Sequence, residues 1–347
     1  MKAIKFTSFL KLAKKIKPKS VYINFKFLII ENENIRFMLK HDFQIDQNSF
    51  EPFELDFDFF KNQIEICEPN DKIRITPFVF AKNSENISFD ILPVKEPSFA
   101  DYDYKNIFKI RIDTNSIHRL KEFASKDHPD FSNVFFVKDH FFATDNKILK
   151  YEDAIFSTSN DNITSFSIKK EFIDIIPKGF FQFTVAHVLK PFVDVKKSEY
   201  ELIMFENDNV NVIITSLKPL IRDFKALFPN KEFGNRSFDN YYTLSINKKV
   251  FENEIKKLAA ENKEFIFIVK KENESFIIVD EGNLIINCRI KKECQIHDHV
   301  LKMALNSKNL LIILKNIKEP IIHMELKEGN IACIINKNSL IMPDKCL

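Results

Sequence analysis

The chain has 347 residues, of which 45% are hydrophobic, and its 52 basic and 49 acidic side chains leave a formal net charge of +3. This length suggests two or three domains rather than one. The near balance of charge excludes a simple, uniformly basic nucleic-acid binder, so positive charge would have to gather on one surface if DNA were the partner. Only four glycines are present, and neither GxGxxG nor GxxxxGKS/T occurs, so we expect no nucleotide-driven chemistry and no cofactor.

The cysteines and the N-terminal residues indicate a cellular compartment. The five cysteines are an odd number without a CxxC pair, which argues against a disulfide framework or a structural zinc site and fits a reducing cytoplasm. Lysines interrupt the apolar residues of the segment 1–19, and no apolar run is long enough to cross a membrane. We therefore expect a cytoplasmic protein without a membrane partner.

Six segments have the apolar spacing of amphipathic helices, and strand-like runs separate them. We expect Phe59, Phe60 and Ile64 to point inward from the second segment, and Val250 from the fifth. In chain order the segments are Thr7–Lys17 (ended by Pro18), Asp56–Cys67, one that opens at the N-cap Asp113–Thr114, Lys169–Ile176, Asn247–Ala260 and one that begins near Ser307.

Many of the runs between these segments alternate apolar and polar residues, as half-buried antiparallel strands do. The pattern predicts an α+β fold of six units, each with one helix and a small antiparallel sheet, which pair into three domains. On pattern alone, an α+β protein without internal symmetry is an open alternative. The strand-like runs include 20–30, 72–80, 87–92, 133–137, 201–205, 209–215, 264–269, 275–280, 284–290, 320–326 and 330–335.

Each predicted helix carries basic residues beside its apolar stripe. On a single helix, lysines usually serve only to keep an exposed face solvated. Their presence on all six indicates a surface that binds phosphates without reading sequence, although acidic residues such as Glu252 and Glu254 occur there too. The candidate DNA-facing residues are Lys11, Lys14, Lys15, Lys61, Arg119, Lys121, Lys169, Lys170, Lys248, Lys249, Lys256, Lys308 and Lys315.

Several segments resemble the bacterial DNA sliding clamp family, the beta subunit of DNA polymerase III. Residues 141–149 resemble the family segment VATDGHRL, with matches at Ala143, Thr144, Asp145 and Leu149. The other matching segments are Phe53–Glu68, Ile87–Tyr104, Leu227–Asn230 (family RFPDY), Leu305–Asn306 with Leu310–Lys318 (family FNVxYLLDALK) and Leu340–Pro343 (family VVMPMRL). The resemblance covers nearly the whole chain at low identity, which indicates a divergent host or a phage origin.

The resemblance implies a ring-forming protein that is not an enzyme. It implies three similar clamp domains at 1–105, 106–238 and 239–347, each with two helices packed on antiparallel sheets, and a head-to-tail homodimer that closes around double-stranded DNA. Leu258 and Ala259 lie near the family's interface segment. The implied partners are a DNA polymerase, which the ring tethers as a processivity factor, and an ATP-driven clamp loader.

The resemblance also implies a hydrophobic pocket for partner peptides between the second and third domains. In this chain Asn146 replaces a family glycine, and Lys147-Ile148 replace a His-Arg pair. Phe233 stands where the family has a basic residue, so we expect a different peptide preference. The matching pocket positions are Phe131, Thr144, Asn146, Lys147, Ile148, Leu149, Pro229, Asn306, Asn309, Leu340, Ile341, Met342 and Pro343.

Three other interpretations compete with this one. Leu340 and Ile341 could form a plain core strand. A metal-dependent enzyme could use His297 and His299 as metal ligands together with His323, since alternate residues of a strand point to one face. A solvated loop explains His297 and His299 better. A clamp-like scaffold that recruits transcription or repair factors would use the same pocket as a replication clamp, and the sequence does not separate the two.

Overall fold

The computed structural model places the chain in two compact units. Unit 1 comprises Met1–Asn115 and Ile155–Lys218, and unit 2 comprises Ser116–Ala154 and Pro219–Leu347. The border between them passes through the range 106–238, and the division into three domains stays a prediction. The structure describes residues 4–32, 35–41, 51–76, 78–83, 85–88, 104–137, 140–154, 166–188, 200–217, 242–261, 265–271, 275–280, 283–291, 302–326 and 332–343.

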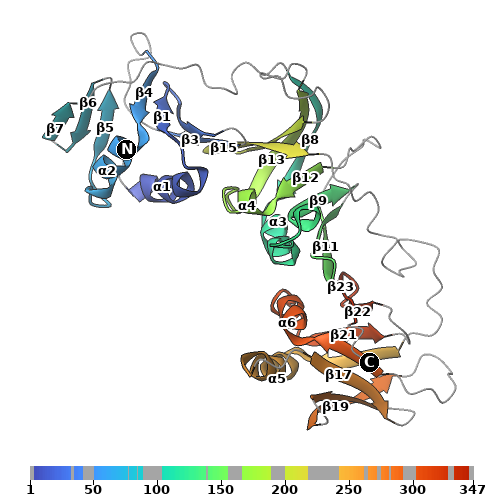
Figure 1. Cartoon of the computed structure of the whole chain (residues 1–347). Coiled ribbons are helices and arrows are strands. Elements are labelled where there is room, and N and C mark those ends of the chain that lie inside the picture. Colours follow the sequence, from blue (N-terminus) through green and yellow to red (C-terminus); the bar gives the residue numbers. More distant parts are fainter. Residues whose placement is uncertain are drawn as a thin grey trace. The chain divides into compact units, whose positions relative to one another are not determined.

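Unit 1 is built on an antiparallel sheet in the order β4-β1-β2-β3-β15-β14-β13-β8. Helices α1 and α2 pack against β1, β2 and β4, and a smaller sheet has the order β5-β6-β7 (Figure 1). The bounds are α1 Ile4–Ile16, β1 Ser20–Ile23, β2 Phe27–Glu31, β3 Ile35–Lys40, β4 Phe53–Asp56, α2 Phe57–Glu65, β5 Ile73–Thr76, β6 Val79–Lys82, β7 Glu85–Ser88, β8 Tyr104–Asp113, β12 Phe166–Lys169, α4 Lys170–Ile173, β13 Phe180–Val188, β14 Tyr200–Glu206 and β15 Val210–Leu217.

Phenylalanines form the contact between the helices and the sheet of unit 1. The ring of Phe60 on α2 lies 5.9 Å from Phe6 and 6.0 Å from Phe9, both on α1, in edge-to-face geometry. Phe9 in turn lies 6.0 Å from Phe37 on β3. All four rings are buried, and such pairs stabilise a core beyond their buried area.

Unit 2 contains one continuous antiparallel sheet in the order β9-β10-β11-β23-β22-β21-β16-β19-β18-β17-β20. Strand β23 lies between β11 and β22, so it joins the segment 116–154 to the C-terminal region. The bounds are α3 Asn115–Leu120, η1 Lys121–Phe123, η2 Pro129–Phe131, β9 Asn133–Val137, β10 His140–Thr144, β11 Ile148–Asp153, β16 Tyr242–Asn247, α5 Lys248–Ala260, β17 Phe265–Lys271, β18 Ser275–Asp280, β19 Asn283–Lys291, β20 Lys302–Asn306, α6 Ser307–Lys315, β21 Ile321–Leu326, β22 Cys333–Ile335 and β23 Ser339–Ile341.

Three of the junctions at which a strand runs directly into a helix share the same cap, whereas Lys169, between β12 and α4, makes no side-chain cap bond. The side-chain oxygens of Asp56, Asn247 and Asn306 accept hydrogen bonds from the backbone N–H three residues later, at 2.8, 3.2 and 3.0 Å. These Asx caps satisfy a donor that a helix start would otherwise leave open. The repeat predicted from sequence therefore has a local structural basis in the junctions β4-α2, β16-α5 and β20-α6.

The structure confirms an α+β class with antiparallel sheets and a helix at each of the six predicted segments. Two side chains that were predicted to point inward, those of Val250 and Phe59, are not buried. Val250 is 51% exposed rather than inward, because the buried stripe of α5 runs through Phe251, Ile255 and Leu258. In α2, Phe57 is buried and Phe59 is only half-buried, because the helix begins at Phe57. The fourth helix, α4, is a single turn.

A candidate partner-binding site and basic helices

The turn between β10 and β11 is fixed by its own side chains. Asp145 Oδ1 accepts hydrogen bonds from the N–H groups of Lys147 and Ile148, both at 2.8 Å. The buried Thr144 hydroxyl donates to Ile148 O at 2.8 Å and accepts from Asn146 N–H at 3.0 Å. Asn146 has a φ of 77°, a left-handed conformation that asparagine tolerates better than most residues. Asparagine at position 146 is therefore compatible with the left-handed conformation of this turn.

Strand pairing brings this turn next to the C-terminal segment. Ile148 pairs with Ile341 and Leu149 with Leu340, as β11 lies antiparallel to β23. Just beyond the pairing, the N–H of Met342 donates to Lys147 O at 2.8 Å. Two of the segments assigned to the pocket, far apart in sequence, are thus neighbours in the structure.

Burial divides these neighbours into core and surface. Leu340 is 3% exposed, and with Leu149 it belongs to a core cluster, while Ile148 and Ile341 are also buried. Their burial fits the interpretation of a core strand, because β23 has a strand on each side. Met342 is 44% exposed. The exposed side chains at this place are those of Met342, Asn146 and Lys147, with Pro343 half-buried.

The other expected pocket residues lie on separate elements. Asn306 and Asn309 occupy the first turn of α6, which packs next to β23, and the Asn306 side chain is the N-cap. Asn247 makes the same cap on α5, so the cap alone explains an asparagine at position 306. Phe131 is half-buried in η2, with its ring 4.7 Å from that of His128. Pro229 lies outside the described residues.

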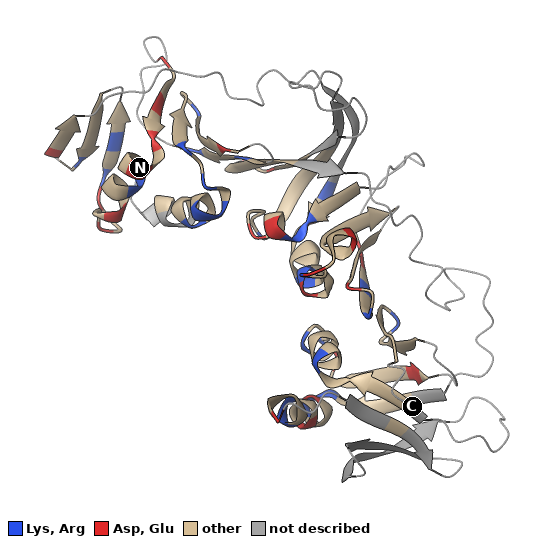
Figure 2. Ribbon diagram, viewed as in Figure 1, with Lys and Arg blue, Asp and Glu red and all other residues tan. Residues whose placement is uncertain are grey.

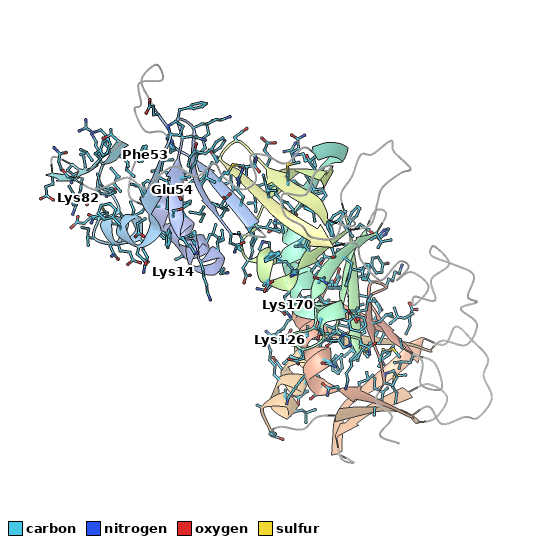
Figure 3. The ribbon with its side chains drawn as sticks, turned by 45° about the horizontal axis from the view of Figure 1, so that its top comes forward. Lys14, Phe53, Glu54, Lys82, Lys126 and Lys170 are labelled. Atoms are coloured by element: carbon cyan, nitrogen blue, oxygen red, sulfur yellow. The ribbon has the colours of Figure 1, made fainter. Side chains whose placement is uncertain are left out.

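Helix faces in both units carry the predicted basic residues (Figure 2). In unit 1, the exposed Lys14 on α1 (labelled in Figure 3) places its Nζ 3.5 Å from Glu65 Oε1. Lys15, also exposed on α1, places its Nζ 3.1 Å from Asp174 Oδ2. Such exposed ion pairs are weak and exchange readily with solvent or phosphate. Of the rest, Lys11 and Lys169 are exposed, and Lys61 and Lys170 are half-buried.

In unit 2 the predicted basic residues fall into two groups. Arg119 donates through Nε to both oxygens of Glu152 at 2.8 and 3.0 Å, and Lys248 donates to Ile317 O. These two are engaged inside the unit and are weaker candidates for DNA contact. Lys256 lies 2.7 Å from Glu252 but keeps half of its side chain in solvent. Lys121 is half-buried, whereas Lys249, Lys308 and Lys315 are exposed.

The described residues hold neither a cluster of metal ligands nor a membrane-spanning helix. Among the described residues, no group of three or more His, Cys, Asp or Glu side chains could hold a metal ion. His323 is exposed, with Nδ1 3.0 Å from Ser245 Oγ, while His297 and His299 lie outside the described residues. Across the same described ranges, no helix is both long and apolar enough to cross a membrane.

The chain is similar to known proteins in its structure but not detectably in its sequence. No protein-family model and no curated protein matches the sequence. The structure is similar to that of the Helicobacter pylori beta clamp bound to a DNA ligase peptide, with a TM-score of 0.72 and 14% identity over 99% of each chain. It is also similar to the Bacillus subtilis DNA polymerase sliding clamp (TM-score 0.70, 14% identity, 100% of this chain and 98% of that one). A third similar structure is that of the Thermotoga maritima DNA polymerase III beta subunit, with a TM-score of 0.69 and 14% identity over 100% of this chain and 99% of that one. The protein therefore has the fold of the bacterial DNA polymerase III beta sliding clamps, at a sequence distance that marks it as divergent.

Proposed function

We propose that this protein is a DNA sliding clamp, which encircles duplex DNA and tethers a DNA polymerase as a processivity factor. The observation that carries the proposal is the similarity to beta clamps over 99% or more of this chain and at least 98% of theirs. A ring holds DNA by its topology, so its function depends on the whole fold rather than on a few reactive groups. The proposed protein is accordingly a binding protein and not an enzyme.

The proposed ring is a head-to-tail homodimer whose helices face the DNA. Exposed lysines, such as Lys11 on α1 and Lys249, Lys308 and Lys315 in unit 2, would make weak, screened contacts to phosphates. Weak contacts keep the duplex centred without holding it at one sequence, which permits sliding. Loading of the closed ring would need a separate ATP-driven clamp loader.

The partner site in this proposal is the surface around Met342. An exposed thioether adapts to several apolar side chains, and Asn146 and Lys147 beside it offer polar contacts. The Helicobacter pylori structure holds a peptide from DNA ligase, which shows that a clamp of this fold binds peptides from other enzymes. Docking of a polymerase tail would keep the enzyme near the primer end through a high effective concentration.

A scaffold that recruits repair or transcription factors is the second candidate function. The replacement of the family's His-Arg pair by Lys147 and Ile148 favours a changed peptide preference, and the buried Ile148 shows that one of the two new side chains is not a surface group. The two functions differ in the peptides that they select. Peptides enriched from a display library on the wild-type protein, and compared with polymerase tails, would separate them.

The first experiment is the mass in solution, from light scattering behind a sizing column at two protein concentrations. A species of about twice 40.9 kDa supports the two-subunit ring. After addition of a clamp loader and ATP, retention of the protein on nicked circular DNA in high salt, and its loss when the same DNA is linearised, would support topological binding. A strict monomer at both concentrations, or equal retention on both DNA forms, would contradict the proposal.

A further inference from the structure

Two lysine side chains converge on the C-terminal end of α6. Lys150 Nζ donates to Asn316 O at 3.0 Å, and Lys248 Nζ donates to the next carbonyl, Ile317 O. The last carbonyls of a helix have no partner within the helix and lie at the negative end of its dipole. The Lys150 ammonium therefore satisfies the C-cap carbonyl of α6, and the Lys248 ammonium satisfies the carbonyl one residue beyond it.

Lys150 is an unusual member of this pair because it is only 4% exposed. Its ammonium lies 3.6 Å from Glu152 Oε1 and 5.7 Å from the centre of the Phe123 ring. Glu152 is itself held by Arg119. Burial lowers the pKa of Lys150, and the neighbouring Glu152 opposes that effect. The chain thus keeps a charge in its interior and gives it a set of fixed partners.

The two lysines differ in the part of unit 2 from which they come. Lys248 begins α5, which packs beside α6 in the C-terminal region. Lys150 belongs to β11, in the segment 116–154, so its bond crosses from that segment to α6. Asn316 makes a second crossing contact, since its Nδ2 lies 3.3 Å from Glu122 Oε2. The end of α6 is therefore a joint between the two sequence segments of unit 2.

This joint lies on the same strand as the candidate partner site. Ile148 is two residues before Lys150 on β11, and its neighbour Lys147 accepts the hydrogen bond from Met342 N–H. A strand that is fixed at Lys150 cannot slide or tilt freely at Ile148.

We infer that Lys150 is a positioning residue, which fixes β11 against the C-terminal end of α6 and thereby sets where the turn 145–147 and Met342 stand. This role rests on the proposed partner site at Met342. An apolar side chain of similar length would satisfy the core at a lower desolvation cost, but it would make no directed bond to Asn316 O. The contribution of Lys150 is therefore the directed bond that positions β11, and not only the burial of its side chain.

The test compares Lys150→Met with Lys248→Met, a matched change that removes an ammonium from the same helix end without cutting the link to β11. The protein is labelled with 13C-methyl methionine, and the Met342 signal is identified by its loss in Met342→Leu in each background. We expect Lys150→Met to shift the Met342 methyl signal and to speed hydrogen exchange of the Met342 N–H by about tenfold or more. Lys248→Met should leave both unchanged, and Met38 and Met204 of unit 1 serve as internal references.

Lys150→Gln and Lys150→Arg keep the question answerable if Lys150→Met folds poorly, because each retains an N–H donor. Lys150→Arg should restore part of the wild-type Met342 signal. An unchanged Met342 signal in a folded Lys150 variant, or equal changes in Lys248→Met, would overturn the inference and leave Lys150 with a general role in stability. The readout needs neither DNA nor a partner, so its failure is distinct from a failure of the clamp proposal.

Discussion

The backbone N–H of Met342 donates to the carbonyl oxygen of Lys147 across 2.8 Å. This bond extends the pairing of β23 with β11 by one residue and places an exposed thioether beside the turn 145–147. Met342 and Leu340 are two residues apart, yet one faces solvent and the other the core. The difference allows partner contact to be tested apart from folding.

Met342→Glu should leave the protein folded but abolish binding of peptides selected on the wild type. The free energy of unfolding should change by no more than about 0.5 kcal/mol, because the side chain is exposed. Leu340→Glu should lower the free energy of unfolding by about 3 kcal/mol or more, since it buries a charge among apolar groups. Urea denaturation and fluorescence anisotropy measure the two effects. Ile321→Glu is the control, because Ile321 is 48% exposed elsewhere in unit 2, and equal loss of peptide binding there would contradict the site.

Asn306 and Asn247 make equivalent caps, so their replacement separates capping from partner contact. Asn306→Ala and Asn247→Ala should each lower the free energy of unfolding by about 1 kcal/mol. If Asn306 belongs to the partner site, only Asn306→Ala should also lower the affinity for the selected peptides. Equal peptide affinity in the two variants would assign Asn306 to the cap alone.

Lys308 offers a test of the DNA-facing surface in which stability and binding move in opposite directions. It is exposed in the first turn of α6, where the helix dipole disfavours a cation. Lys308→Glu should therefore raise the free energy of unfolding by about 0.3–1 kcal/mol. The same change should weaken the affinity of the protein for linear duplex DNA at low salt, because it removes a phosphate contact. An affinity equal to that of the wild type would remove Lys308 from that surface.

The buried ammonium of Lys150 predicts a pH dependence of stability. Because its pKa is lowered in the folded state, mainly by burial, the unfolded chain binds more protons between the folded-state pKa and the ordinary lysine value. The free energy of unfolding should therefore rise with pH through that window, and the penalty is fully present at lower pH. Urea denaturation from neutral pH to pH 10, as wild type minus Lys150→Met, isolates this contribution from other lysines. A flat difference would contradict the prediction.

The sequence predicted the features that local chemistry decides. Amphipathic spacing was enough to locate α2, α5 and α6 within a few residues. The role of Lys150 was out of reach, because a lysine within a strand normally points to solvent and its acceptor, Asn316, is 166 positions away. Arg119 was assigned to the DNA-facing set for the same reason, since its partner Glu152 is distant in sequence. Among the candidate site residues, adjacency of the turn to Leu340–Met342 followed from the resemblance, whereas their burial required the structure.

The place of β23 in the sheet has a consequence for how the protein folds during synthesis. Strand β11 has no neighbour on that side until Ser339–Ile341 leave the ribosome, long after Ile148–Asp153 have emerged. Until then β11 has an unpaired edge, whose free backbone N–H and C=O groups can pair with strands of other chains. Unit 2 must therefore close late, through contacts of large sequence separation, and its folding should be slower and more dependent on chaperones than the formation of its helices.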